Sequence, residues 1–137
     1  MRSVVVAANV IVSFFVDRHK KQRDAADALL QKAEEGDIAA IIPQFVVFEV
    51  TYVLQSQYGF GGRRLAEMIR DVVNFPGVRV IDDCPWKRVM ELWPDPFPSL
   101  ADAAIAAVAA ANRYDAVATF DRKLAKRAQD LGISAYW

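Results

Sequence analysis

Three acidic residues far apart in the chain carry the side chains that a hard divalent cation binds. Glu49, Asp102 and Asp121 each lie just after a predicted strand or near the start of a predicted helix. Mg²⁺ and Mn²⁺ select oxygen ligands of this kind. If the fold brings the three carboxylates together, they predict a metal site built from oxygen ligands.

Two of these acids also have a purely structural interpretation. Asp121 directly precedes the predicted helix at residues 122–130, where its carboxylate can cap backbone N–H groups. Asp102 lies three residues after Ser99 in a pattern like a capping box, where a negative charge is stabilised by the positive helix end. Helix capping therefore remains an alternative to metal binding at both positions.

Glu49 and Asn9 are the other polar residues that merit attention. At about 100° per residue, Glu49 shares a helix face with the apolar residues Phe45, Val46, Tyr52 and Val53. A carboxylate buried on such a face is costly unless a cation or hydrogen-bond donors compensate it. This favours a functional role, and the alternatives are a satisfied core acid or a misjudged helix face. Asn9 follows the first predicted strand and either forms a local Asx turn or orients an acid at the sheet edge.

Apolar runs and turn residues predict alternating strands and helices. The predicted strands cover residues 4–7, 39–42, 78–81, 116–119 and 133–136. The predicted helices cover residues 24–35, 44–58, 63–73, 85–93, 99–112 and 122–130. We expect Pro43 in the first turn of the second helix, and an extended connection through the prolines at 94, 96 and 98.

This alternation predicts an α/β fold with one mostly parallel sheet covered by helices on both faces. Ligands of such sheets bind outside the carboxyl ends of the strands, which is where the acids are expected. With 137 residues, the chain has the length of a single domain, residues 1–137.

The amino-acid composition limits the classes of function that this protein can have. The 17 Lys and Arg residues balance the 17 Asp and Glu residues, so any contact with nucleic acid must be a local patch. The single cysteine, Cys84, excludes an internal disulfide and a thiolate zinc site, and it fits a reducing cytoplasm. The apolar start at residues 3–15 resembles neither a signal peptide nor a membrane span.

Other motifs for chemistry are weak. His19 is the one histidine, and it lies in a polar run at residues 17–21 that indicates a solvated loop, which disfavours a Ser-His-Asp triad. The glycines at residues 59–62 lack the lysine of a P-loop and indicate a turn. We interpret three tryptophans as packing or interface residues rather than as a base-stacking platform: Trp86, Trp93 and Trp137.

The order of short motifs resembles a known family. A first strand with Asn9 precedes Phe48-Glu49-Val50, Leu100-Ala101-Asp102-Ala103 with Ile105-Ala106, and Thr119-Phe120-Asp121. This order is similar to that of a PIN domain, and the length resembles the VapC-type toxins of toxin–antitoxin pairs. The resemblance implies an α/β/α sandwich and an endoribonuclease that depends on Mg²⁺ or Mn²⁺. It also implies RNA and a cognate antitoxin as partners, and a homo-oligomer such as a homodimer.

Carried over by motif, the resemblance assigns Glu49, Asp102 and Asp121 as metal ligands and catalytic acids, with Asn9 as a supporting amide. A fourth acid is expected at the end of the first strand, where this chain has Ala7. The chain is therefore predicted to be an impaired nuclease, and the alternative is a non-catalytic PIN-like module that binds RNA or a protein. A receiver domain is disfavoured, because it needs acids directly after the first strand.

Basic residues near these motifs are candidates for steering an RNA backbone. Their alternative role is that of solvated helix faces. The main candidates are Arg122, Lys123 and Lys126, and the others are Arg127, Arg18, Lys20 and Lys21.

Overall fold

The computed structural model describes all residues from 1 to 137 and contains one five-stranded parallel sheet. The strands are β1 (Arg2–Val6), β2 (Ile38–Pro43), β3 (Val78–Ile81), β4 (Ala116–Ala118) and β5 (Ser134–Ala135). The helices are α1 (Ala8–Phe15), α2 (Lys20–Glu34), α3 (Gln44–Ser56), α4 (Gly62–Val73), α5 (Trp86–Leu92), α6 (Leu100–Ala111) and α7 (Arg122–Asp130).

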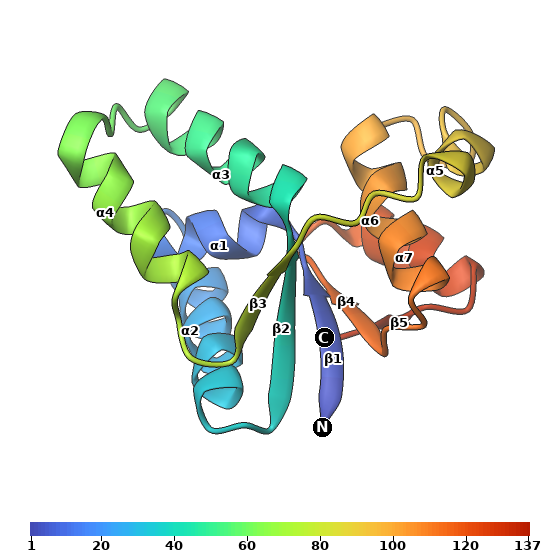
Figure 1. The fold of residues 1–137 in the computed structure, drawn as a ribbon, viewed down its shortest axis with the longest axis horizontal. Coiled ribbons are helices and arrows are strands. Elements are labelled where there is room, and N and C mark those ends of the chain that lie inside the picture. The colour runs from blue at the N-terminus through green and yellow to red at the C-terminus, as the bar shows by residue number, and fades with distance from the viewer.

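The helices cover both faces of the sheet. Figure 1 shows the sheet in the middle, with α1 to α4 on one side and α5 to α7 on the other. Every neighbouring strand pair is parallel, and the spatial order is β3-β2-β1-β4-β5. The predicted three-layer α/β/α fold with a parallel sheet is therefore confirmed.

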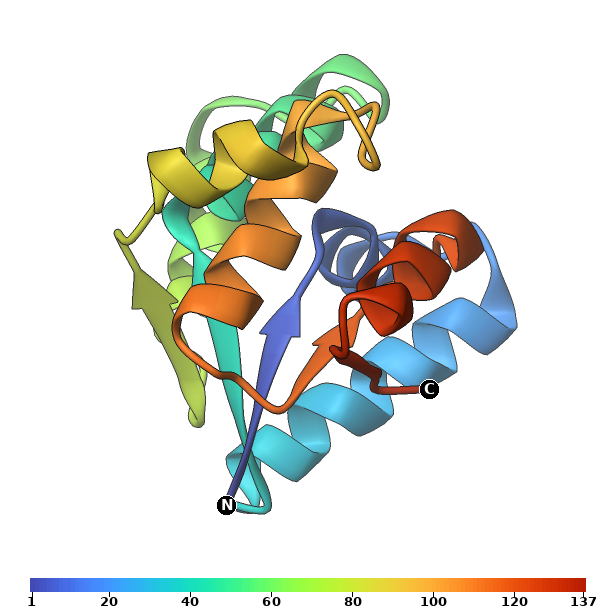
Figure 2. The same cartoon turned by 90° about the vertical axis from the view of Figure 1, so that its right-hand side faces the viewer.

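The apolar strands form the centre of the core. Val4, Val5 and Val6 in β1 are fully buried, as expected for a strand with helices on both faces. In α6, every residue from Ala103 to Ala109 is buried, so this helix is enclosed on all sides. Its small alanine side chains allow the close approach to the sheet and to α5 that Figure 2 shows from the helix side.

Helix α1 was not predicted from the sequence. Its run Val10-Ile11-Val12 has a low helix propensity and resembles a strand continuation. The three side chains are almost completely buried, and this packing overrides the local preference. As a result, Ala7 is not a strand residue as predicted but the N-cap of α1, and its side chain provides no cap hydrogen bond.

Three further predictions about local structure were wrong. The run at residues 17–21 is not wholly a loop, because α2 begins at Lys20 and the Nδ1 atom of His19 accepts a hydrogen bond from Gln22 N–H at 3.3 Å. The proline segment is not extended: residues 93–96 form turns, and Phe97 is fully buried in the core. Pro43 ends β2 and precedes α3 rather than occupying its first turn.

The remaining predicted elements are confirmed with shifts of a few residues at their ends. The strand at 78–81 and the helix at 122–130 have the predicted bounds. The helix predicted at 44–58 ends earlier, at Ser56. None of the helices has the length and apolar content needed to cross a bilayer.

One glycine allows the start of β3 to pack closely against helix α2. Gly77 precedes β3 with φ +83°, and a Cβ atom added there would collide with the backbone carbonyl of Ala33 in α2. Gly132 has nearly the same backbone conformation, φ +84°, but a Cβ atom there would meet nothing within 4 Å.

We therefore expect Gly77→Ala to lower the free energy of unfolding more than Gly132→Ala. Both variants place a side chain at positive φ, at a cost of about 1–2 kcal/mol. The collision at residue 77 adds a further ~1–3 kcal/mol. Urea denaturation followed by circular dichroism measures the difference, and equal losses in the two variants would contradict the packing of the β3 start against α2.

Candidate active site

The sheet order places a ligand-binding edge between β1 and β4. Strands β1 to β3 are added in one direction from β1, and β4 and β5 in the other. In doubly wound sheets, the loops after the two strands at such a switch point diverge and leave a crevice at the carboxyl edge. After β1 come Ala7 and the first turn of α1, which contains Asn9, and the loop after β4 contains Thr119 and Asp121.

The side-chain amide of Asn9 joins the start of α1 to the loop after β4. Asn9 Nδ2 donates to Thr119 Oγ1 at 3.0 Å, and Asn9 Oδ1 accepts from Phe120 N–H at 3.0 Å. Thr119 Oγ1 also accepts from Asp121 N–H at 3.1 Å. Asn9 therefore forms no local Asx turn but fixes the backbone that carries Asp121, which is the orienting role that the sequence left open.

Asp121 caps α7, as one of its two interpretations predicted. Its Oδ1 atom accepts from Lys123 N–H at 2.9 Å and from Leu124 N–H at 3.4 Å. Its Oδ2 atom takes part in neither bond. One oxygen of this carboxylate therefore satisfies the helix end while the other stays available to a ligand.

Asp102 lies in the first turn of α6. Its N–H donates to Ser99 Oγ at 3.3 Å, so the predicted Ser99 cap is confirmed. The carboxyl is half-buried, and burial together with the Asp121 carboxylate raises its pKa, whereas Arg127 lowers it. Two helix N-termini, those of α6 and α7, thus bring two acids close enough for their charges to interact.

Glu49 is placed differently from the prediction. The buried stripe of α3 consists of Val46, Val50 and Leu54, and Glu49 lies on the exposed side of the helix together with Tyr52. The predicted burial of the Glu49 face was wrong, because α3 instead buries the neighbouring stripe, mainly against α1 and α4. Partial removal from water still raises the pKa of Glu49, and the Asp102 carboxylate adds to this increase.

The three acids therefore interact through Asp102. Glu49 is coupled to Asp102, and Asp102 is coupled to Asp121. Nowhere in the chain do three or more His, Cys, Asp or Glu side chains lie close enough together to hold a metal ion. Strand β1 lies between β2, which leads into the Glu49 helix, and β4, which leads to Asp121. The residue after β1 is Ala7, whose methyl group is buried.

The chemistry of this donor set suits a hard divalent cation. All three side chains are carboxylates. Burial and a neighbouring carboxylate raise the pKa of Glu49 and of Asp102, and a cation bound beside Asp102 would relieve the repulsive part of this cost. Asp102 has the central position, with Glu49 and Asp121 as its neighbours. The gap in the set is at residue 7, where alanine offers no oxygen.

Two polar residues have interactions at this edge that the sequence did not predict. Thr119 is 8% exposed and accepts hydrogen bonds from Asn9 in α1 and from Asp121 in its own loop. A hydroxyl at the end of an apolar strand is a usable signal for such a position. Arg127 acts on Asp102 from a different helix, and no spacing in the sequence could have indicated that contact.

The predicted RNA-steering cations differ in their surroundings. Lys126 is paired with Asp130 at 2.7 Å, and Lys20 with Asp24 at 2.9 Å. Arg122 and Lys123 are exposed at the start of α7, next to Asp121, and neither forms a salt bridge. The two residues nearest to the acid edge thus keep their charge free for a phosphate.

The raised pKa values predict how stability depends on pH. Because folding raises the pKa of Asp102 and Glu49, the folded chain binds more protons than the unfolded chain between the ordinary and the raised pKa. The free energy of unfolding should therefore fall as the pH rises through this window.

Asp102→Asn removes the central charge and should stabilise the metal-free protein at about pH 7, with a smaller gain near about pH 4.

Urea denaturation in EDTA at both pH values measures this gain. Asp71→Asn, an exposed position on α4, is the matched control and should show no such pH-dependent gain. A gain in Asp102→Asn that grows on acidification would contradict the mutual repulsion of the acids.

Comparisons with known proteins agree with this architecture. The crystal structure of PAE2754 from Pyrobaculum aerophilum is similar, with a TM-score of 0.65 and 19% sequence identity, covering 92% of this chain and 84% of that chain. This likeness establishes the fold. A search of curated proteins finds no match. A family model described as "PIN domain" matches residues 4–130, and PIN domains are a nuclease fold that acts on RNA and generally uses divalent metal ions. Because that match spans nearly all of the sequence, this chain belongs to the PIN domain family.

Proposed function

We propose that this protein is a metal-dependent endoribonuclease of the toxin type found in toxin–antitoxin pairs, with activity weakened by Ala7. The observation that carries the proposal is the charge interaction of Asp102 in α6 with Glu49 in α3 and with Asp121 at the N-cap of α7. Helix capping alone explains Asp121 and the start of α6, but it gives no reason for the coupling of Glu49 to Asp102.

Each residue has a defined role in this proposal. Asp102, with Glu49 and Asp121 beside it, would hold Mg²⁺ or Mn²⁺, and Asn9 positions the loop that carries Asp121. A divalent cation at this edge polarises a phosphoryl oxygen and lowers the pKa of an attacking water. Arg122 and Lys123 attract the RNA backbone toward the acids.

Alanine at residue 7 explains why the activity would be weak. Even changes around metal ligands that do not touch the metal cost about 10–100-fold in affinity or activity, so the loss of a direct ligand costs at least as much. Ala7 is 3% exposed and lies at the end of the central strand, so water has little access with which to replace the missing oxygen.

The missing acid also favours a second candidate function, a non-catalytic PIN-like module that binds RNA or a protein through the same edge. Under this alternative, the remaining acids would serve capping and partner contacts. The two functions differ in one respect: restoring an acid at residue 7 creates cleavage only in a chain that keeps the rest of a nuclease site.

An antitoxin or a second copy of the chain is proposed to bind over α3. Phe48 and Tyr52 are both 68% exposed, lie one helical turn apart and flank Glu49 in the sequence. Phe48 also lines an open cavity of about 610 Å³ between α3 and α4. A partner that covers these aromatic side chains would also shield the acid edge.

We also propose a cytoplasmic location, with which the one free cysteine, Cys84, is compatible.

Cleavage assays with an Ala7→Asp variant test the nuclease proposal. With Mn²⁺ and a labelled RNA that contains a hairpin and single-stranded segments, we expect this variant to cleave about 10–100-fold faster than the chain as written, or more. Two controls keep the shape of the site but remove charge: Ala7→Asn, and Ala7→Asp combined with Asp102→Asn.

Circular dichroism verifies that the variants fold, since residue 7 is buried. If a folded Ala7→Asp variant cleaves no faster than its Asp102→Asn control, the nuclease proposal fails and the binding-module alternative is favoured.

A further inference from the structure

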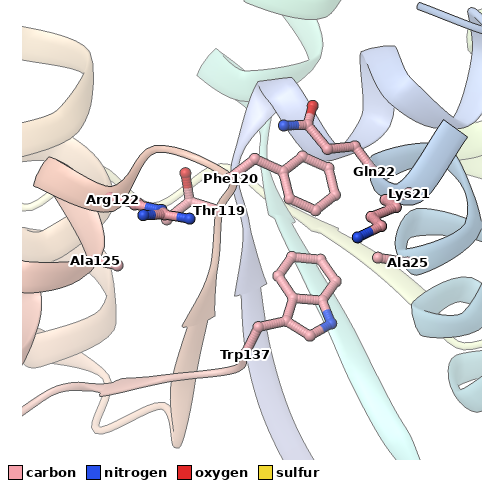
Figure 3. Close-up of a pocket in the computed structure, with 8 residues that line it drawn as sticks. All are labelled: Lys21, Gln22, Ala25, Thr119, Phe120, Arg122, Ala125 and Trp137. Carbon is pink, nitrogen blue, oxygen red and sulfur yellow. The ribbon is translucent and has the colours of Figure 1, made fainter. Parts of the chain in front are cut away.

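An open cavity adjoins the acid edge but contains none of the acids. It has a volume of about 360 Å³ and lies between the start of α2 and the start of α7. Figure 3 shows Lys21 and Gln22 on one side, Thr119 and Arg122 on the other, and the rings of Phe120 and Trp137 between them. The composition of the wall is thus aromatic in the middle and cationic at both ends.

The aromatic part of this wall is already arranged for stacking. Phe120 and Trp137 are stacked, with ring centroids 4.7 Å apart and an angle of 15° between the planes. Trp137 nevertheless remains 49% exposed. Packing, one of the two roles predicted for Trp137 from the sequence beside an interface, explains its contact with Phe120 but not the half of its surface that is exposed.

The two cations at the rim have no acidic partner. Neither Lys21 nor Arg122 forms a salt bridge, and no Asp or Glu lines the cavity. In a chain with a formal net charge of zero, two unpaired cations at one cavity make a local positive site. The Gln22 side chain adds an amide donor and acceptor beside the rings.

The cavity is joined to the acid edge through the backbone at residues 119–121. Thr119 and Phe120 line the cavity, while the hydroxyl of the former and the N–H of the latter bond to Asn9. Asp121 is the next residue. A group bound against Phe120 therefore lies directly beside the loop that presents this carboxylate.

We propose that this cavity is a subsite for one unpaired nucleotide of single-stranded RNA, an inference that rests on the proposed function. The base stacks on the Phe120–Trp137 pair, and its flanking phosphates contact Lys21 and Arg122. Stacking on aromatic side chains requires a base that is not already stacked in a duplex, so the subsite selects single-stranded RNA. It places the neighbouring phosphodiester at the acid edge.

Binding assays in EDTA test the subsite without cleavage. Fluorescence anisotropy of a short labelled single-stranded RNA gives the affinity of each variant. Removal of a stacking ring should weaken binding by about 5–100-fold in Trp137→Ala. Trp137→Phe should keep most of the affinity, and Trp86→Ala, which removes a tryptophan that is 57% exposed on α5, should keep all of it.

The cations are tested by the salt dependence of binding. For single strands, each lost phosphate contact lowers the slope of log affinity against log salt by about 0.7. We expect this decrease in Lys21→Ala but not in Lys87→Ala, an exposed lysine on α5. Duplex RNA should compete poorly with the labelled single strand.

Three results would overturn the subsite: equal affinities of Trp137→Ala and Trp86→Ala, equal competition by duplex RNA, or loss of a dimer in Trp137→Ala with RNA affinity unchanged.

Cleavage by Ala7→Asp with Mn²⁺ separates the subsite proposal from the nuclease proposal. If cleavage occurs but Trp137 is irrelevant to binding, only the subsite fails. If Trp137 is required for binding but no variant cleaves, only the nuclease proposal fails.

Discussion

The parallel direction of the five strands is the constraint on which the site depends. Because every strand runs the same way, every helix that follows a strand begins at one edge, and polar residues from distant parts of the sequence are collected there. The reversal of strand order between β1 and β4 opens that edge at one point. The Asn9 amide spans the opening and joins the start of α1 to the loop after β4 with two hydrogen bonds of 3.0 Å.

Three carboxylates lie at this edge, and neighbouring groups stabilise their negative charges only in part. Backbone N–H groups of α7 stabilise one oxygen of Asp121, and Arg127 acts favourably on Asp102. Glu49 has no comparable partner, and both burial and Asp102 disfavour its charged form. Alanine at residue 7 avoids a further negative charge in the middle of this group. It also leaves the N-terminus of α1 without a side-chain cap, which an aspartate there would supply.

Local patterns were sufficient to predict much of the sheet and the caps. The β-branched run in β1 and the Asp121 cap depend on neighbouring residues, and both were confirmed. Helix α1 could not be predicted in this way, because its β-branched residues become helical only through burial against the rest of the core. The exposure of Glu49 was mispredicted for a related reason: helical periodicity gives the faces of α3 but not which face packs against α1 and α4.

Contacts between distant residues were beyond the reach of sequence patterns. Asn9 lies 110 residues from Thr119, so its hydrogen bond appears only once the strand order is known. The charge coupling of Asp102 to Arg127 depends on how α6 and α7 approach each other. Trp137 likewise gains its stacking partner Phe120 from the return of the chain to β4 through β5. Residue types thus indicated the chemistry, while topology determined which residues perform it.

Mn²⁺ titration followed by nuclear magnetic resonance tests most directly whether the acid edge binds a cation. Paramagnetic Mn²⁺ broadens the amide signals of residues near its binding site. In the chain as written, we expect the first signals to broaden at Asn9, Asp102 and Asp121, and we expect Asp102→Asn to abolish this pattern. Broadening that is spread over exposed acids elsewhere, such as Asp82 and Asp83, and is unchanged in Asp102→Asn would contradict a metal site at this edge.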